Sequence, residues 1–236
     1  MKRLLPLLFA VSLAASIASG ATTGNLLVNP GAESGSITGW NPYGPTGSPT
    51  VDSGNFDKGI NPHSGSYDFL GHSGAQDHLW QTISFTDSSV TSQGITNALI
   101  DAGQVTYTFS FWEQSLNQGN PSDEAGVQLF FWDGSDDLLN PNPPVFWQDA
   151  DGGQWLQYTY SATVPATARS VDYYILFQRN QGNDLDAFVD DNVFTLQTSS
   201  LGVTATPEPS TAGLLIAALL AAVSIAGCRR VSRSPL

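Results

Sequence analysis

The feature that most constrains the fold is an alternation of apolar and polar residues with a period of two. In residues 105–112, Val, Tyr and Phe alternate with Thr and Ser. Because successive side chains of a β-strand point to opposite faces, this pattern predicts a strand with one buried face. Similar patterns predict strands over residues 127–132, 155–162, 171–177 and 187–196, with shorter strands at 26–28, 67–70 and 79–85.

Turn-forming residues separate the predicted strands. Asn140-Pro141-Asn142-Pro143-Pro144 is one such cluster of residues that favour turns. The sequence has no convincing amphipathic helical repeat, and we expect only one short helix, near residues 97–101. Eight or more short strands joined by turns predict an all-β fold, a β-sandwich or jelly roll.

The N-terminus carries a secretory signal. Its first three residues include Lys2 and Arg3, an apolar stretch covers residues 4–18, and the small residues 19–21 follow. These are the basic, hydrophobic and cleavage regions of a signal peptide. We therefore expect residues 1–21 to be removed on export and the folded domain to span residues 22–200.

The C-terminus carries an apolar segment followed by positive charge. Residues 212–228 are 17 uncharged residues, which is near the lower limit for a membrane-spanning helix. The basic tail, residues 229–236, would stay on the cytoplasmic side of the membrane. Residues 201–211 are the predicted linker. On hydropathy alone, a permanent single-span anchor and a segment that is later cleaved fit equally well.

Within that linker stands the triplet Pro207, Glu208 and Pro209. Together with the apolar run and the arginine-rich end, it resembles the PEP-CTERM sorting signal of Gram-negative bacteria that produce exopolysaccharide. The resemblance implies a processing partner, a membrane protease of the exosortase family, which would cut near the triplet. The chain would be anchored in the inner membrane only transiently. It would then reach the cell surface, the outer membrane or the extracellular matrix.

Removing both ends leaves a strongly acidic chain. Residues 22–206 contain three basic residues, Lys58, Arg169 and Arg179, against twenty acidic ones, for a net charge of about −17. Such a domain repels nucleic acids, which we exclude as partners, and it favours cations. The only cysteine, Cys228, lies in the tail, so stability must come from the core and from any bound metal.

Four landmarks occur in the order found in galactose-binding-like jelly rolls. They are residues 25–33 with Gly39-Trp40 shortly after, the His-Ser-Gly segment of residues 62–67, residues 79–83, and the segment of residues 188–193 that contains Asp190 and Asp191. The sequence thereby resembles this fold class, which includes carbohydrate-binding modules related to families 4, 9 and 22. The resemblance covers nearly the whole domain and implies a jelly-roll β-sandwich. It does not identify a ligand, because one fold carries many functions.

The same resemblance implies a structural calcium ion near the two ends of the domain. Carried over to this sequence, its ligands are the carbonyl groups of Gly31 and Gly65 and the carboxylates of Glu33 and of Asp190 or Asp191. Calcium binds several oxygen ligands in flexible geometry, and this mixture suits it. The alternative is that both aspartates are exposed turn residues. The strand register decides which of the two points inward.

Outward-facing aromatic and amide residues are candidates for binding a glycan. Flat apolar rings stack on sugar faces, and amides form hydrogen bonds with hydroxyl groups. If Tyr107, Phe109 and Phe111 fill the core, then Trp112 faces outward. The predicted binding set is Trp112, Gln114, Gln128, Trp132, Trp147 and Gln178. The alternative is that these tryptophans fill the core or support loops.

The sequence gives no support for catalysis. Residues 71–75 look like a nucleophile elbow but end in Ala75 instead of glycine, and we expect a hairpin loop there. The spacings of His63, His72 and His78 fit no helical metal-binding motif. We therefore expect an exported, non-catalytic surface or matrix protein that binds polysaccharide. A structural or adhesive protein without a defined small ligand, and an unrecognised hydrolase, remain alternatives.

Overall fold

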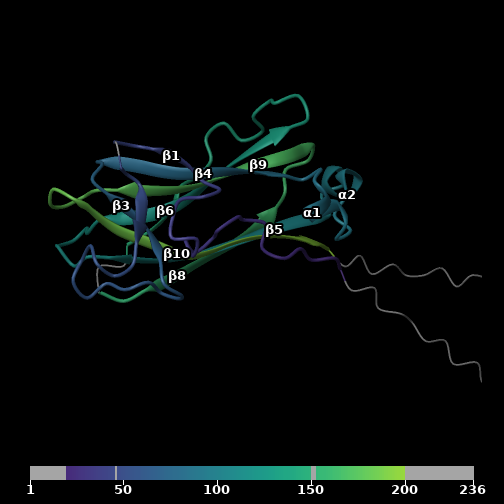
Figure 1. Ribbon diagram of the computed structural model, residues 1–236. Coiled ribbons are helices and arrows are strands. Elements are labelled where there is room, and N and C mark those ends of the chain that lie inside the picture. Colours follow the sequence, from purple (N-terminus) through teal and green to yellow (C-terminus); the bar gives the residue numbers. More distant parts are fainter. Residues whose placement is uncertain (1–19, 46, 150–152, 200–236) are drawn as a thin grey trace, which may run out of the picture. The chain divides into compact units, whose positions relative to one another are not determined.

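Two antiparallel β-sheets stack face to face in the computed structural model of the protein, which describes residues 20–45, 47–149 and 153–199 (Figure 1). Residues 20–199 make up one compact unit with its own core. Most of the expected signal peptide, the triplet Pro207, Glu208 and Pro209, the apolar segment of residues 212–228 and the basic tail lie outside the described residues. The helices in the described residues are only four and five residues long, which is too short to span a bilayer.

The described residues of the domain form ten strands and two short helices. They are β1 (Asn41–Tyr43), β2 (Thr50–Asp52), β3 (Asp68–His72), β4 (Gln76–Ser84), α1 (Ser88–Thr91), α2 (Asn97–Asp101), β5 (Val105–Ser115), β6 (Glu124–Asp133), β7 (Phe146–Gln148), β8 (Leu156–Thr163), β9 (Ala168–Gln178) and β10 (Leu185–Thr198). The strand order is β2-β3-β10-β5-β8 in one sheet, here called sheet A, and β1-β4-β9-β6-β7 in the other, sheet B. The chain repeatedly crosses from one sheet to the other, so the predicted all-β jelly-roll sandwich is confirmed.

The period-two alternation builds the core between the sheets. In β5 the residues Tyr107, Phe109 and Phe111 are buried, while the intervening threonines and serine are only partly covered. The facing strand β9 buries Tyr173 in the same way. The rings of Phe109 and Tyr173 meet edge to face, with centroids 6.3 Å apart. Alternate residues of each strand therefore belong to one continuous core and the others to an outer face.

The predicted strand at residues 26–28 does not form. This segment runs beside β10, and Leu26 N donates to Phe194 O at 2.9 Å. The side chain of Asn25 replaces the regular strand pairing, because its Oδ1 accepts from the backbone N–H groups of Leu27 and Phe194 and its Nδ2 donates to Asn192 O. A side chain that competes for backbone partners interrupts regular secondary structure.

The segment of residues 71–75 is not a hairpin loop. It joins the end of β3, in sheet A, to the start of β4, in sheet B, so it connects two sheets and not two paired strands. Within it, Gly74 N donates to the carboxylate of Asp77 at 3.0 Å. The helix expected near residues 97–101 is confirmed as α2, whose first turn is capped by the side chain of Thr96. The expectation of only one helix was wrong, because α1 forms as well.

Candidate functional site

The outer face of sheet B carries a row of residues that crosses all five strands. The strand register places Tyr43, His78, Leu176, Gly126 and Trp147 side by side in this order. Tyr43 is 66% exposed, and its ring stacks on His78 with centroids 4.7 Å apart. The row therefore has aromatic rings at both ends and small or aliphatic groups between them.

Gly126 lets Trp147 lie close to the sheet. A Cβ atom at position 126 would come within 2.8 Å of the Trp147 ring and 2.9 Å of the Phe146 carbonyl oxygen, so no other residue fits without displacing β7. Between Trp147 on one side and Tyr43 with His78 on the other lies a groove of about 960 Å³, also lined by Leu176. A groove of this size is typical of ligand sites.

Polar groups lie next to the aromatic row. Gln76, Gln178 and Glu124 form the adjacent row across β4, β9 and β6. The side chain of Gln76 donates to Gln178 Oε1, and Gln178 Nε2 donates to the backbone of Arg179. Among the described residues, no lysine or arginine lines the groove, and burial lowers the pKa of its one histidine, His78. This row offers amide groups to a ligand without placing a cation beside it.

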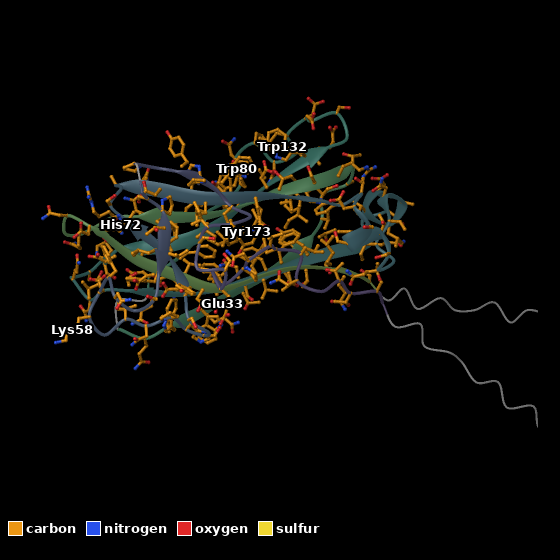
Figure 2. All side chains as sticks on the ribbon, viewed as in Figure 1. Glu33, Lys58, His72, Trp80, Trp132 and Tyr173 are labelled. Atoms are coloured by element: carbon orange, nitrogen blue, oxygen red, sulfur yellow. The ribbon has the colours of Figure 1, made fainter. Side chains whose placement is uncertain are left out.

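Further rings extend this surface along the strands. Trp80 and Tyr174 are cross-strand neighbours whose rings stack with centroids 5.9 Å apart, and the ring of Phe130 meets Tyr174 edge to face. At the far end, Trp132 Nε1 donates to Asp172 Oδ2 at 2.8 Å. Figure 2 shows Trp80 and Trp132 projecting from the outer side of sheet B, whereas Tyr173 points between the sheets. We call the surface formed by the following residues the aromatic face: Tyr43, His78, Trp80, Phe130, Trp132, Trp147 and Tyr174.

The structure divides the predicted binding residues between two surfaces. Gln128, Trp132, Trp147 and Gln178 lie on the outer side of sheet B, although the amide of Gln128 is already bonded to Pro143 O. Trp112 and Gln114 lie on β5 in sheet A. The six residues therefore do not form one site, because β5 and β6 belong to opposite sheets.

Trp112 has a different environment from the aromatic face. Its ring stacks on His63 with centroids 3.9 Å apart, and Trp155 meets His63 edge to face at 5.8 Å. Gln114 is only 4% exposed. The loop that contains His63 thus covers this part of sheet A.

Sequence reasoning missed most of the aromatic face. The alternation of Leu79 and Ile83 with Trp80 and Thr82 in β4 is a signal that could have placed Trp80 outward. Tyr43 gave no such signal, because a three-residue strand is too short to show a period.

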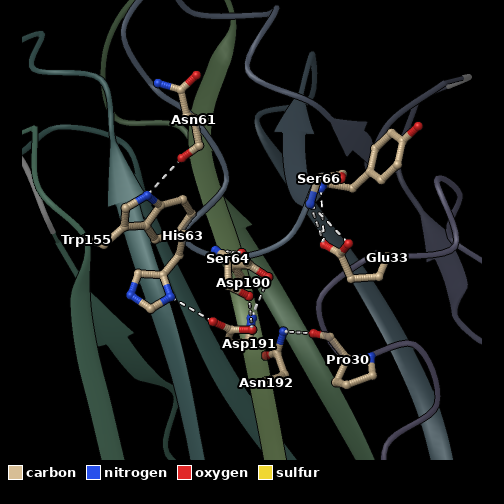
Figure 3. A network of polar contacts seen from close by, with 11 residues as sticks. Pro30, Glu33, Asn61, His63, Ser64, Ser66, Trp155, Asp190, Asp191 and Asn192 are labelled. Atoms are coloured by element: carbon tan, nitrogen blue, oxygen red, sulfur yellow. Dashed lines mark hydrogen bonds and ion pairs between the residues drawn. The ribbon is translucent and has the colours of Figure 1, made fainter.

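A second polar region joins the N-terminal segment, the loop after β2 and the last strand (Figure 3). Asp190 Oδ2 accepts from Ser64 N at 2.9 Å, and Asp191 accepts from His63 Nδ1 and from the hydroxyl group of Ser64. Asn192 donates to Pro30 O through its side chain at 2.9 Å. Three segments that are distant in the sequence are therefore held together by consecutive residues of β10.

The predicted calcium ligands lie in this region, but Glu33 is not in its closest group of ligand atoms. The carboxylate of Glu33 accepts from Ser66 N at 3.0 Å, and the position of Gly65, with a φ of 63°, leaves no room beside it for a side chain. An oxygen of Asp190 lies directly against Gly31. Of the two aspartates, Asp190 is fully buried and Asp191 is partly exposed. The register shift of β10 after Asp190 produces this difference.

A closer group within this region includes a residue that we did not predict. Ligand atoms of His63, Asp190 and Asp191 lie within 4.8 Å of one another. Burial, followed by repulsion from Asp191 and Glu33, raises the pKa of Asp190 to about 7, against a lowering by its hydrogen bond from Ser64. A buried carboxylate with acidic neighbours fits a cation site.

Comparison with known proteins supports the fold. No protein-family model matches the sequence, and no curated protein matches it. Among solved structures, TmCBM61 in complex with beta-1,4-galactotriose is similar, with a TM-score of 0.51 and 16% identity over 72% of this chain and 97% of that chain. The enzymatically active domain of tailspike protein 4 of bacteriophage CBA120 matches with a TM-score of 0.50 and 16% identity, over 72% of this chain and 21% of that chain. The jelly-roll sandwich is therefore a fold that this chain shares with carbohydrate-binding modules.

One further buried acid makes stability depend on pH. Asp68 is fully buried on β3, directly opposite Asp52 on β2. Burial, and then repulsion from Asp52 and Asp190, raises the pKa of Asp68 from 3.8 to about 8. The folded protein therefore keeps a proton that the unfolded chain releases, and stability falls as the pH rises from about 4 to 8.

Replacing Asp68 tests this dependence. Between pH 7 and 8 we expect the free energy of unfolding of the wild type to fall by roughly 1 kcal/mol in calcium-free buffer. In Asp68→Asn the fall should be much smaller, as measured from urea unfolding at each pH. Asp87→Asn, which changes an exposed acid, controls for the loss of one negative charge. An unchanged slope in Asp68→Asn would show that this group does not titrate there.

Proposed function

We propose that this domain is a non-catalytic module that binds polysaccharide along the aromatic face of sheet B. The observation that carries the proposal is the row from Tyr43 to Trp147, which places aromatic rings on both sides of a groove of about 960 Å³. The relationship in fold supports it, since TmCBM61 was solved in complex with beta-1,4-galactotriose.

The chemistry of the face suits a sugar chain. The C–H groups on one side of a pyranose ring form an apolar patch, and aromatic side chains such as Tyr43 and Trp147 present flat apolar surfaces that match it. The amide groups of Gln76 and Gln178, at the end of the groove, can donate to and accept from hydroxyl groups. The rings would provide most of the affinity and the amides would fix the orientation.

The shape of the surface favours a chain over a single sugar. Rings continue from His78 through Tyr174 to Phe130 along the sheet. A ligand of several sugar units could contact the groove and this extension together. Because no lysine or arginine lines the groove and burial lowers the pKa of His78, the groove has no permanent cation that would select a polyanionic glycan.

Single substitutions distinguish this face from the other sheet. Tyr43→Ala and Trp147→Ala should each weaken the Kd for a bound oligosaccharide about tenfold, because a ring contact worth roughly 1.4 kcal/mol corresponds to that factor. Trp112→Ala is the matched control, since this partly exposed tryptophan lies on sheet A. Binding is measured by calorimetry after a glycan array has identified a ligand.

Three outcomes would contradict the proposal. If no glycan binds saturably, the structural or adhesive alternative is favoured. If Trp112→Ala weakens binding and Trp147→Ala does not, then the site lies on sheet A. Release of reducing ends from a bound glycan would favour the hydrolase alternative instead.

We further propose that calcium stabilises the domain by joining its two ends. Asp190, Asp191 and Glu33 would supply carboxylate oxygens, and Gly31 and Gly65 would supply carbonyl oxygens. A cation there would offset the burial of the Asp190 carboxylate and its repulsion from Asp191 and Glu33, which together raise its pKa. Oxygen donors of both kinds suit calcium better than a transition metal.

Calcium should therefore raise the melting temperature of the wild type, and a chelator should reverse the effect. At a hundredfold excess of free calcium over its Kd, the stabilisation is about 2.7 kcal/mol. Asp190→Asn should abolish the response, whereas Asp172→Asn, which changes the hydrogen-bond partner of Trp132 on the other sheet, should retain it. A wild-type melting temperature that is the same in calcium and in chelator would disprove the proposal.

We also propose that the protein is exported and processed at its C-terminus by an exosortase-type protease. The support is in the sequence, where the triplet Pro207, Glu208 and Pro209 precedes an apolar run and a basic tail. A cell-surface or matrix location fits a glycan-binding module.

The intact mass of the protein purified from its producing cells tests this processing. We expect a mature chain that begins near residue 22 and ends near Pro209, recovered from the extracellular or outer-membrane fraction. A chain that keeps Leu236 and remains in the inner membrane would instead support a permanent anchor.

A further inference from the structure

The four sheet edges of the domain are not equally protected. Three are formed by β1, β2 and β7, each only three residues long. β1 contains Pro42, β2 follows Pro49 and contains Asp52, and β7 follows Pro143 and Pro144 closely. Short length, proline and inward charge are the features by which proteins prevent an edge strand from pairing with another chain. These three edges are therefore protected against pairing with another chain.

The fourth edge, β8, lacks these protections. It runs for eight residues, Leu156–Thr163, and pairs with β5 over its whole length without a register shift. Its sequence, Leu-Gln-Tyr-Thr-Tyr-Ser-Ala-Thr, contains no charged residue, no proline and no glycine. Six of the eight residues are exposed, including Leu156 (43%) and Tyr160 (37%). A long, uncharged and regular edge of this kind is a site for adding a strand.

The backbone of β8 has hydrogen-bonding groups directed away from the sheet. Val164 N donates to Val105 O at 2.9 Å, which fixes the phase of the ladder with β5. Because antiparallel pairing alternates, the even-numbered residues of β8 bond to β5. The N–H and C=O groups of Gln157, Thr159, Ser161 and Thr163 therefore point to the open side.

We propose that this edge binds β8 of a second copy of the chain in antiparallel pairing. The domain carries a net charge of about −17, so two copies repel each other over most of their surfaces. β8 is a long segment without charge, so pairing through it places no like charges within the contact itself. Pairing would join the two A sheets into one continuous sheet of ten strands.

This pairing produces a dimer and no larger assembly. Of the four edge strands, β8 is the one that is long and free of proline and charge, and in a contact between two β8 strands each copy uses this same edge. Such an isologous contact forms a two-fold dimer and leaves no edge for further growth. In the joined sheet, the core-facing sides of the two A sheets lie on the same side. Leu156 and Tyr160 then pack against the partner strand and lose their exposure to water. The aromatic face lies on the other sheet and stays accessible.

Substitutions at Ser161 test the pairing through the backbone. Ser161→Pro removes an N–H group that points to the open side and leaves the bonds to β5 in place. Ser161→Ala is the matched control, because both changes remove the hydroxyl contact with Thr108 but alanine keeps the N–H group. By sedimentation equilibrium of residues 20–199, the wild type and Ser161→Ala should reach twice the monomer mass with rising concentration. Ser161→Pro should stay at the monomer mass.

A second pair of variants keeps the test valid if proline disturbs folding. Thr159→Lys places like charges near each other across the proposed contact and should prevent dimerisation. Thr106→Lys, on the same face of sheet A but on the inner strand β5, should dimerise as the wild type does. A wild type that remains monomeric at every concentration, a dimer that survives both Ser161→Pro and Thr159→Lys, or growth beyond two copies would overturn the proposal.

Discussion

The packing of β5 against β9 is the interaction on which the rest of the structure depends. Rings such as Phe109 and Tyr173 meet between the sheets, and every residue that points into this core leaves its neighbour on an outer face. On β9 this places Tyr174 and Leu176 outside, in register with Trp80 and His78 of β4. The aromatic face is therefore the outer counterpart of the core, and its spacing follows from the spacing of the strands.

The longer strands could be predicted from the sequence because their pattern is set by burial on one side. β5, β6, β8, β9 and β10 form where the alternation predicted strands. The strands that were missed, β1, β2 and β7, are three residues long and are fixed by pairing with longer neighbours. Tyr43 and Trp147, at the two ends of the groove row, lie on these short strands. Pairing partners distant in the sequence decide where such segments lie, and no local pattern records them.

The sequence predicted which residues form the candidate calcium region, but not the position of each one within it. The structure brings Glu33, Gly65 and Asp190 into one region, as expected from the resemblance. It also shows that Asp190 is the buried aspartate, a fact that depends on a local shift of register in β10. The expectation of a single binding set failed at Trp112, because alternation shows that a side chain points outward but not from which of two sheets. The contact of His63 with Asp191 has no sequence signal beyond the His-Ser-Gly segment.

The depth of the groove on sheet B depends on Gly126. The glycine lies beneath Trp147, where even a methyl group would meet the ring and the neighbouring backbone. The depth of the groove therefore depends on the lack of a Cβ atom at Gly126. It cannot be adjusted in small steps, because even the smallest side chain would meet Trp147. Any substitution of Gly126 would displace β7, which carries Trp147. Variation in what such a surface accepts would have to arise at Tyr43, on the opposite wall, where a side chain can change while the strands beneath it stay in place.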